Sequence, residues 1–282
     1  MADVTATMIK EVRERTGVGM GKCKQALVEA NGNIEDAISL LRKQGMASAA
    51  KKQSRQTKEG MIGAAETDGC IAIVEAGSET DFVIQNERFQ QFLKNMAEEV
   101  AQSMPADLSS FLNQKYSKEP DLTIEEYRGT IVQTIGENIE IKRIHVLPKA
   151  KDHSYGIYSH LNGKILVVVE IAGSEEEEEL AKNIAMHTAA ASPEYVSPEQ
   201  VPSEILDRER EIAKEQMKGK PENIMEKIVE GKINAYYDEV CLTHQAYIRD
   251  DKQSVGQVVE ARAKETGKPL KLINFIRWAV GE

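Results

Sequence analysis

The stretch GMIGAAETDGCIAIVEAGSE, residues 60–79, decides the fold of this chain. Met61–Glu66 and Cys70–Glu75 have the length and apolar content of strands, and they flank Asp68-Gly69. An Asp-Gly pair between two such runs is a strong hairpin signal, because both residue types tolerate the positive φ that tight hairpin turns require. The stretch therefore predicts an antiparallel β-hairpin that runs into Ala76-Gly77-Ser78-Glu79.

A second stretch, GIYSHLNGKILVVVEIAGSE at residues 156–175, repeats this arrangement. Two strand-like runs flank Asn162-Gly163, and the second run again ends on Ala-Gly-Ser-Glu, at 172–175. We interpret the pattern as an internal duplication, in which helices and a third strand follow each hairpin. It predicts two antiparallel three-stranded sheets with helices. The segments that supply the helices and third strands are 86–103, 125–136, 139–146, 180–190 and 272–278.

Two helical additions accompany this duplicated core. Residues 4–44 have the apolar spacing of a three-helix domain similar to UBA domains, and residues 46–59 read as a linker or an exposed helical extension. Residues 198–240 contain two charged helices joined by Lys218-Gly219-Lys220-Pro221. Apolar residues a heptad or one turn apart indicate a helical hairpin, and its high charge favours a hairpin that projects from the body over one packed on the sheet. These residues are Ile205 with Ile212, and Ile224 with Ile228.

The sequence thus predicts an α+β protein with an N-terminal three-helix domain, a duplicated core of two antiparallel three-stranded sheets, and an inserted helical hairpin. We expect the N-terminal domain and linker at 1–54, the first core subdomain at 55–148 and the second at 149–282. The second subdomain contains the helical hairpin 198–240.

Composition excludes several classes of function. The net charge of −10 gives no basic footprint for phosphates, so we expect no direct nucleic-acid partner and no anionic membrane surface. Cys23, Cys70 and Cys241 are odd in number and far apart, which argues against disulfides and a zinc site. The start does not resemble a signal peptide, and there is no run of 18 apolar residues. We therefore expect a cytoplasmic protein.

Motifs of catalysis are absent from the sequence. None of the five histidines has metal-ligand spacing, and there is no nucleophile elbow, phosphate-binding loop or dinucleotide fingerprint. The acidic run 175–179 reads as a solvated helix N-terminus, where carboxylates are favoured. We therefore expect a binding protein and no enzyme. A hydrolase that uses His187 or His160 with the acidic run is the lowest-ranked alternative.

Phe82, in the polar stretch SETDFVIQN at residues 78–86, needs an explanation because only 5% of the chain is aromatic. Aligning the two Ala-Gly-Ser-Glu segments places Phe82 opposite Glu178, which favours exposure over packing against Phe89 as a hydrophobic staple. An exposed Phe beside an Asp on a short anchored loop is typical of a binding hot spot.

Four segments carry a resemblance to a known family. Together they resemble elongation factor Ts, the guanine nucleotide exchange factor of elongation factor Tu, from one end of the chain to the other. The segments are EVRERTGVGMGKCKQAL with EANGNIEDAI at 11–38, TDFV at 80–83, IGENIEIKR at 135–143, and NIAMHTAAASPEYV at 183–196.

The resemblance implies a mechanism. The N-terminal domain would dock on the GTPase domain of elongation factor Tu, and Asp81 and Phe82, between Thr80 and Val83, would enter beside the Mg²⁺ and phosphate site. Mg²⁺ would be dislodged, GDP would leave, and GTP would later displace the factor. No cofactor of its own is implied, because the Mg²⁺ belongs to the partner. Further positions that match partner contacts are Arg13, Met20, Lys24, Lys52, Ile135, Gly136 and His160.

Structural alternatives exist for some of these positions: Met20 as a core residue, Gly136 as a helix cap and His160 as a surface strand residue. The chain also departs from the family pattern. Gly21 replaces a Met that is frequent there, 104–124 resembles an enlarged irregular connection, and the chain stops where many relatives continue into a C-terminal helical module. The alternative function is a ubiquitin-like-binding or scaffold protein that uses the three-helix unit. A dimer or heterotetramer is compatible with the sequence.

Overall fold

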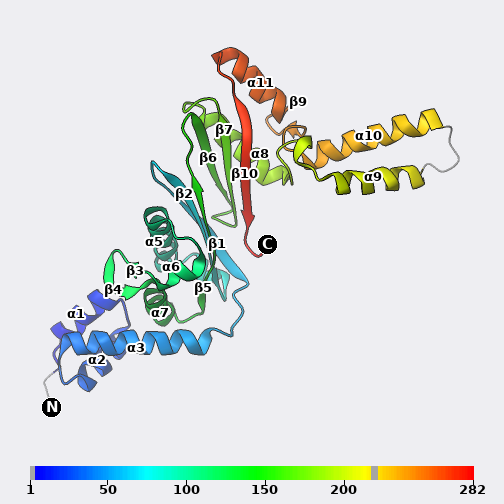
Figure 1. Ribbon diagram of the computed structural model, residues 1–282. Coiled ribbons are helices and arrows are strands. Elements are labelled where there is room, and N and C mark those ends of the chain that lie inside the picture. The colour runs from blue at the N-terminus through cyan, green and yellow to red at the C-terminus, as the bar shows by residue number, and fades with distance from the viewer. Residues whose placement is uncertain (1–3, 217–221) are drawn as a thin grey trace. The chain divides into compact units, whose positions relative to one another are not determined.

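The computed structural model describes residues 4–216 and 222–282 (Figure 1). Contacts divide the chain into two compact units. One runs to Lys149 and includes Ala279–Glu282, and the other spans Ala150–Trp278. The finer division at residues 54 and 148 stays a prediction. No helix of the described residues is long and apolar enough to cross a membrane.

The first sheet contains the predicted hairpin. β1 (Glu59–Glu66) and β2 (Cys70–Ser78) pair antiparallel, with Glu59 opposite Ser78 and Glu66 opposite Ile71. β5 (Ile139–Pro148) pairs antiparallel with β2, which gives the order β1-β2-β5. The central strand β2 is buried along its whole length, as expected for a strand covered on both edges and packed beneath helices.

The second sheet repeats this order. β6 (His153–His160) and β7 (Ile165–Ala172) form the second hairpin, and β10 (Lys271–Ala279) completes the order β10-β7-β6. The turn uses positive φ at Leu161, Asn162 and Gly163, a conformation that Asn and Gly adopt at low cost. In both sheets the second hairpin strand is central and the last strand comes from the end of the unit. The predicted duplication is therefore confirmed.

The duplication extends into the stretch 104–124, which we expected to be an irregular connection. That expectation is wrong. The stretch contains α6 (Leu108–Asn113) and a short hairpin of β3 (Lys115–Tyr116) and β4 (Glu119–Thr123). Phe111 and Tyr116 are fully buried there. A two-residue strand is too short to produce a periodic signal, so the pattern was invisible in the sequence.

A capped helix follows this small hairpin in both units. α7 (Ile124–Ile135) begins with a capping box of Thr123 and Glu126. In the second unit β8 (Ala246–Tyr247) and β9 (Asp250–Ser254) precede α11 (Val255–Thr266), which begins with a capping box of Ser254 and Gln257. Both helices end on a glycine in the left-handed conformation, Gly136 and Gly267.

Each sheet is covered by one long helix. α5 (Glu87–Ser103) packs across β1 and β2 with Phe89, Phe92 and Met96 fully buried. α8 (Glu178–Ala191) packs on β6 and β7. It approaches β6 so closely that a Cβ on Gly156 would lie 2.1 Å from the backbone nitrogen of Lys182. Only glycine fits at that position without moving the helix.

The N-terminal helices are α1 (Ala6–Thr16), α2 (Met20–Glu29) and α3 (Ile34–Lys52). They share a core of buried residues that includes Val12, Leu27 and Leu41, so the predicted three-helix unit is confirmed. α3 continues through much of the expected linker and packs along α7. A small domain of about 40 residues gains stability from such docking.

The predicted helical hairpin is present in the second unit. α9 (Ser203–Gln216) and α10 (Glu222–Val240) lie side by side and extend away from the sheet β10-β7-β6 (Figure 1). Ala213, Val229 and Ile233 are buried, whereas Ile212 is exposed, so the expected heptad contact of Ile212 is wrong. The predicted connection Lys218-Gly219-Lys220-Pro221 and the side chain of Ile224 lie outside the described residues.

Candidate partner-binding site

Phe82 is the most exposed large apolar side chain of the described residues, at 84%. It lies on α4 (Asp81–Ile84), a single helical turn that follows β2, and Asp81 beside it is also exposed. Val83 and Ile84 on the same turn are buried. The predicted exposure of Phe82 is therefore confirmed, and the alternative of Phe82 as a staple against the core is wrong.

Thr80 fixes the start of this turn. Its backbone N–H donates to Glu137 Oε2 at 3.0 Å and its hydroxyl donates to Glu137 Oε1 at 2.7 Å. Its carbonyl accepts from the Ser78 hydroxyl at 3.0 Å. Thr80 occupies the N-cap position of α4 but makes no side-chain cap bond, and its hydroxyl donates to Glu137.

Glu79 makes a second connection between the same two segments. Its Oε1 accepts from the Asn138 backbone N–H at 2.6 Å and from Arg55 at 3.3 Å, while the Asn138 side chain donates to the Arg55 carbonyl at 2.9 Å. The fold thus brings together the turn Thr80–Val83, the end of α7 with the segment after it, and the end of α3 with the residues after it. Among the predicted residues, this cluster contains Ile135, Gly136 and Lys52.

Gly136 has a structural role at this place. It ends α7 with φ of 94°, and its backbone N–H donates to the Val132 carbonyl at 2.9 Å. Other residues would be strained in this left-handed conformation. The chain turns here so that Glu137 faces Thr80. Gly136 is also exposed, and a Cβ added there would meet no atom within 4 Å, so the cap role leaves room for a partner.

Lys52 is half-buried, so its charge is less available than we expected for a partner contact. Its Nζ donates to the Val132 carbonyl at 3.5 Å, near the C-terminus of α7, where a cation is favoured by the helix dipole. Burial lowers the pKa of Lys52, and nearby Arg55 acts in the same direction. Lys52 therefore stabilises the C-terminal end of α7, next to the turn Thr80–Val83.

The other predicted residues of the first unit lie on the three-helix bundle. Met20 is 59% exposed, so the alternative of Met20 as a core residue is wrong. Lys24 follows it one turn later on α2, and Arg13 lies in α1; both are exposed. Gly21 is exposed beside Met20, with open space where a side chain would be.

His160 belongs to the second unit, at the exposed end of β6. Its Nδ1 lies 3.0 Å from the Tyr158 hydroxyl. His160 is thus an exposed strand residue paired with a neighbour on its own strand. This fits the alternative of His160 as a surface strand residue.

The acidic run is exposed as predicted, except at Glu177. Glu177 is buried and accepts from Arg262 Nε at 2.7 Å, and Glu176 pairs with Lys268. Within the described residues, no cluster of His, Cys, Asp and Glu could hold a metal ion.

Both ring nitrogens of His187 are engaged in hydrogen bonds, so neither is available to act in hydrolysis. The side chain is fully enclosed: its Nδ1 accepts from the Ile248 backbone N–H at 3.2 Å, so Nε2 carries the proton and donates to Gln245 at 3.0 Å. Burial lowers the pKa of His187, which the hydrogen bond to Gln245 opposes. His187 is a neutral structural residue.

This environment predicts a pH effect on stability. Because the folded pKa lies below that of the unfolded chain, about 6.5, the contribution is complete at higher pH and is lost as the pH falls below that value. Replacing His187 with Gln should cost stability at pH 7.5, and the difference from wild type should shrink at pH 5. Urea unfolding at both pH values measures it. A difference that is independent of pH would contradict the assignment.

Comparison with known proteins bears on these residues. A family model described as Elongation factor TS matches residues 79–282. The chain is 62% identical over 282 residues, the full length of both proteins, to an Elongation factor Ts of Protochlamydia amoebophila. It is 44% identical over 281 residues to that of Chlamydia muridarum and 43% to that of Chlamydia trachomatis serovar L2, with all of each chain covered.

The chain belongs to the elongation factor Ts family. Its function is accordingly guanine nucleotide exchange on elongation factor Tu during translation elongation, in which GDP is released. The ubiquitin-like-binding or scaffold alternative is not favoured.

Sequence reasoning missed the residues that connect this cluster, among them Glu79, Glu137 and Asn138. Two of them lie inside the segment IGENIEIKR, which we used only for the family resemblance. The available signal was a polar pair, Glu137 and Asn138, between a helix-ending glycine and a buried strand. Polar residues at such a junction need partners when they are partly buried.

Proposed function

We propose that the turn Thr80–Val83 is the element that opens the nucleotide site of elongation factor Tu, with Asp81 and Phe82 entering beside its Mg²⁺ and phosphates. The observation that carries the proposal is Phe82, an 84% exposed aromatic on a single turn with buried neighbours on one side. Large exposed aromatics on rigid supports are the usual anchors of protein interfaces.

The three-helix unit supplies the docking surface in this proposal. Met20, with Arg13 and Lys24, offers an apolar centre with cationic neighbours to the GTPase domain. Ile135 and Gly136 adjoin the turn and would contact the partner beside it. Lys52 would act through α7, and His160 would add a contact from the second unit.

The energies require this division of roles. An acceleration of GDP release by ~1,000-fold needs a barrier lowered by about 4 kcal/mol. Burying one Phe contributes roughly 1.5–3 kcal/mol before any cost of association. Phe82 alone falls short, so the docking surfaces must contribute. The coupling between nucleotide binding and factor binding is reciprocal. Bound nucleotide must therefore weaken the affinity of the factor for its partner by the same factor.

The proposed action requires no covalent step and no cofactor, since binding alone disturbs the site of the partner. We propose the cytoplasm as its location, because the function in elongation implies the compartment of translation. A dimer or a heterotetramer with the partner stays a prediction.

The direct test loads elongation factor Tu with a fluorescent GDP analogue and follows its release after addition of the protein. We expect release to accelerate with factor concentration and to reach a plateau. Prior chelation of Mg²⁺ should reduce the acceleration, because the factor would then have no ion to dislodge. No acceleration at saturating protein would overturn the exchange function.

A further inference from the structure

We infer that Glu137 is the positioning residue for Asp81 and Phe82: its carboxylate, bound to Thr80, sets the pose in which the turn meets the partner. The inference rests on the proposed function of the turn. Glu137 itself does not need to touch the partner. Its two oxygens accept from the N–H and the hydroxyl of Thr80 at 3.0 and 2.7 Å.

A turn as short as α4 needs external support. Four residues form one helical turn, which is unstable in isolation. The usual N-cap bond is missing, and the Thr80 hydroxyl donates to Glu137 instead. Bonds to a carboxylate are charge-assisted and stronger than those between neutral groups. The first end of the turn is therefore fixed by Glu137.

The second end is fixed by packing. Val83 and Ile84 are buried, and the Gln90 side chain donates to the Ile84 carbonyl at 3.0 Å. Asp81 and Phe82 lie between these two anchors and are exposed. Release of the Glu137 anchor would leave their side chains accessible but free to adopt several poses.

Glu137 is itself held in place. The left-handed Gly136 directs the chain after α7 toward the turn, and the next residue, Asn138, donates its backbone N–H to Glu79 Oε1 at 2.6 Å. Each segment thus provides one carboxylate for the other: Glu79 for Asn138, and Glu137 for Thr80. These two hydrogen bonds connect residues that are 57 and 59 positions apart in the sequence.

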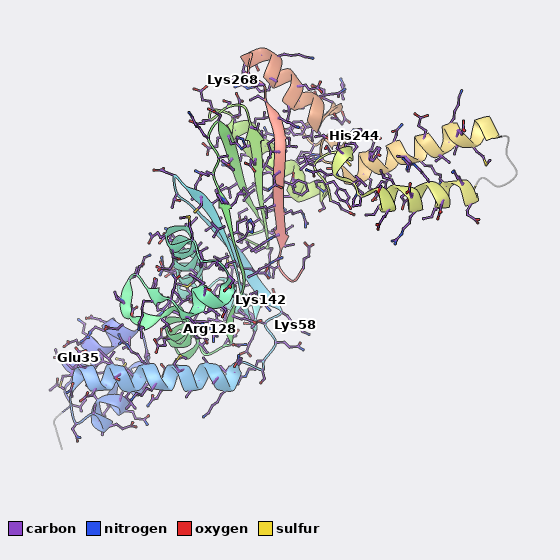
Figure 2. All side chains as sticks on the ribbon, viewed as in Figure 1. Glu35, Lys58, Arg128, Lys142, His244 and Lys268 are labelled. Carbon is purple, nitrogen blue, oxygen red and sulfur yellow. The ribbon has the colours of Figure 1, made fainter. Side chains whose placement is uncertain are left out.

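The second unit contains the same connection without an aromatic. Alignment on Ala-Gly-Ser-Glu places Glu176 opposite Thr80, and alignment on the helix-ending glycines places Lys268 opposite Glu137. Lys268, which follows the end of α11 (Figure 2), donates to Glu176 and, at 3.0 Å, to the Ser174 hydroxyl. Both units therefore connect the loop after the hairpin to the residue after the glycine cap. Only in the first unit does that loop carry a Phe.

This duplication separates a structural role from a positioning role. A connection that only supports the fold should have similar consequences in both units. A connection that orients Phe82 should affect nucleotide exchange only in the first unit. Loss of orientation should lower the maximal rate more than the affinity, because docking surfaces elsewhere still bind.

The experiment compares Glu137→Ala with the matched control Lys268→Ala in the full chain. Fluorescent GDP release is measured over a range of factor concentrations, which gives a plateau rate and a half-saturating concentration, and thermal unfolding is recorded for each variant. We expect Glu137→Ala to lower the plateau roughly tenfold with less than about a threefold change in half-saturation. Lys268→Ala should leave both values unchanged.

A second pair keeps the test valid if Glu137→Ala folds poorly. Thr80→Val keeps the shape but removes the hydroxyl donor, so it should lower the plateau, whereas Thr80→Ser should retain it. An unchanged plateau in both Glu137→Ala and Thr80→Val, or an equal loss in Lys268→Ala, would overturn the inference. Phe82→Ala is run alongside: if it retains full activity, the proposed function of the turn fails first.

Discussion

Replacing Phe82 with Ala should slow factor-dependent GDP release by roughly 10- to 100-fold, with no loss of thermal stability. The truncation removes about 1.5–3 kcal/mol of apolar burial against the partner, and each 1.4 kcal/mol is a factor of ten in rate. In the free protein the side chain is 84% exposed and contributes little to the core. Stopped-flow release of fluorescent GDP and a thermal melt measure the two quantities.

Met104→Ala is the matched control for Phe82→Ala. Met104 lies in the same unit and is also a large exposed apolar side chain, at 58%. A general loss of surface apolarity would affect both variants alike, and we expect Met104→Ala to behave as wild type. If Phe82→Ala also exchanges at the wild-type rate, the turn does not act as proposed.

Gly156→Ala should destabilise the second unit by about 3 kcal/mol or more, the largest effect on stability that we expect from a single methyl group. The added Cβ would lie 2.1 Å from Lys182 N and 2.2 Å from the Ala181 carbonyl carbon. Both are backbone atoms of α8, so no side-chain rotation relieves the clash. The helix must move off β6 and release the contacts beneath it.

The chain offers a probe and a control for this prediction. Its single tryptophan, Trp278, lies in the second unit, so its fluorescence in urea reports the unfolding of that unit. Gly231→Ala, in α10, meets no atom within 4 Å and should stabilise by about 0.5–1 kcal/mol through helix propensity. Similar unfolding midpoints for wild type and Gly156→Ala would show that α8 is less closely packed than described.

Much of the fold was predictable because its signals are local. The pairs Asp68-Gly69 and Asn162-Gly163 mark both hairpins, and repetition of the segment after them reveals the duplication. The same repetition predicted the exposure of Phe82 from its counterpart Glu178. These inferences needed only residue types and local spacings, compared between two similar segments of the same chain.

The missed features depend on contacts between distant residues. Glu177 looked like a solvated member of an acidic run, but its partner Arg262 is 85 residues away. Ile212 looked like a heptad residue, whereas the neighbouring Ala213 is buried instead. The bond between Thr80 and Glu137 also joins segments that no local pattern relates. Side-chain partners of this kind are determined by tertiary packing, which periodicity does not describe.

The central claim is that Phe82 acts in the pose that Glu137 sets, and a double-mutant cycle of plateau GDP-release rates tests it most directly. Coupled residues have non-additive effects. We predict that Glu137→Ala lowers the plateau roughly tenfold when Phe82 is present, and less than about threefold in the Phe82→Ala background. An equal loss in both backgrounds would show that Glu137 and Phe82 act independently, and would contradict the account.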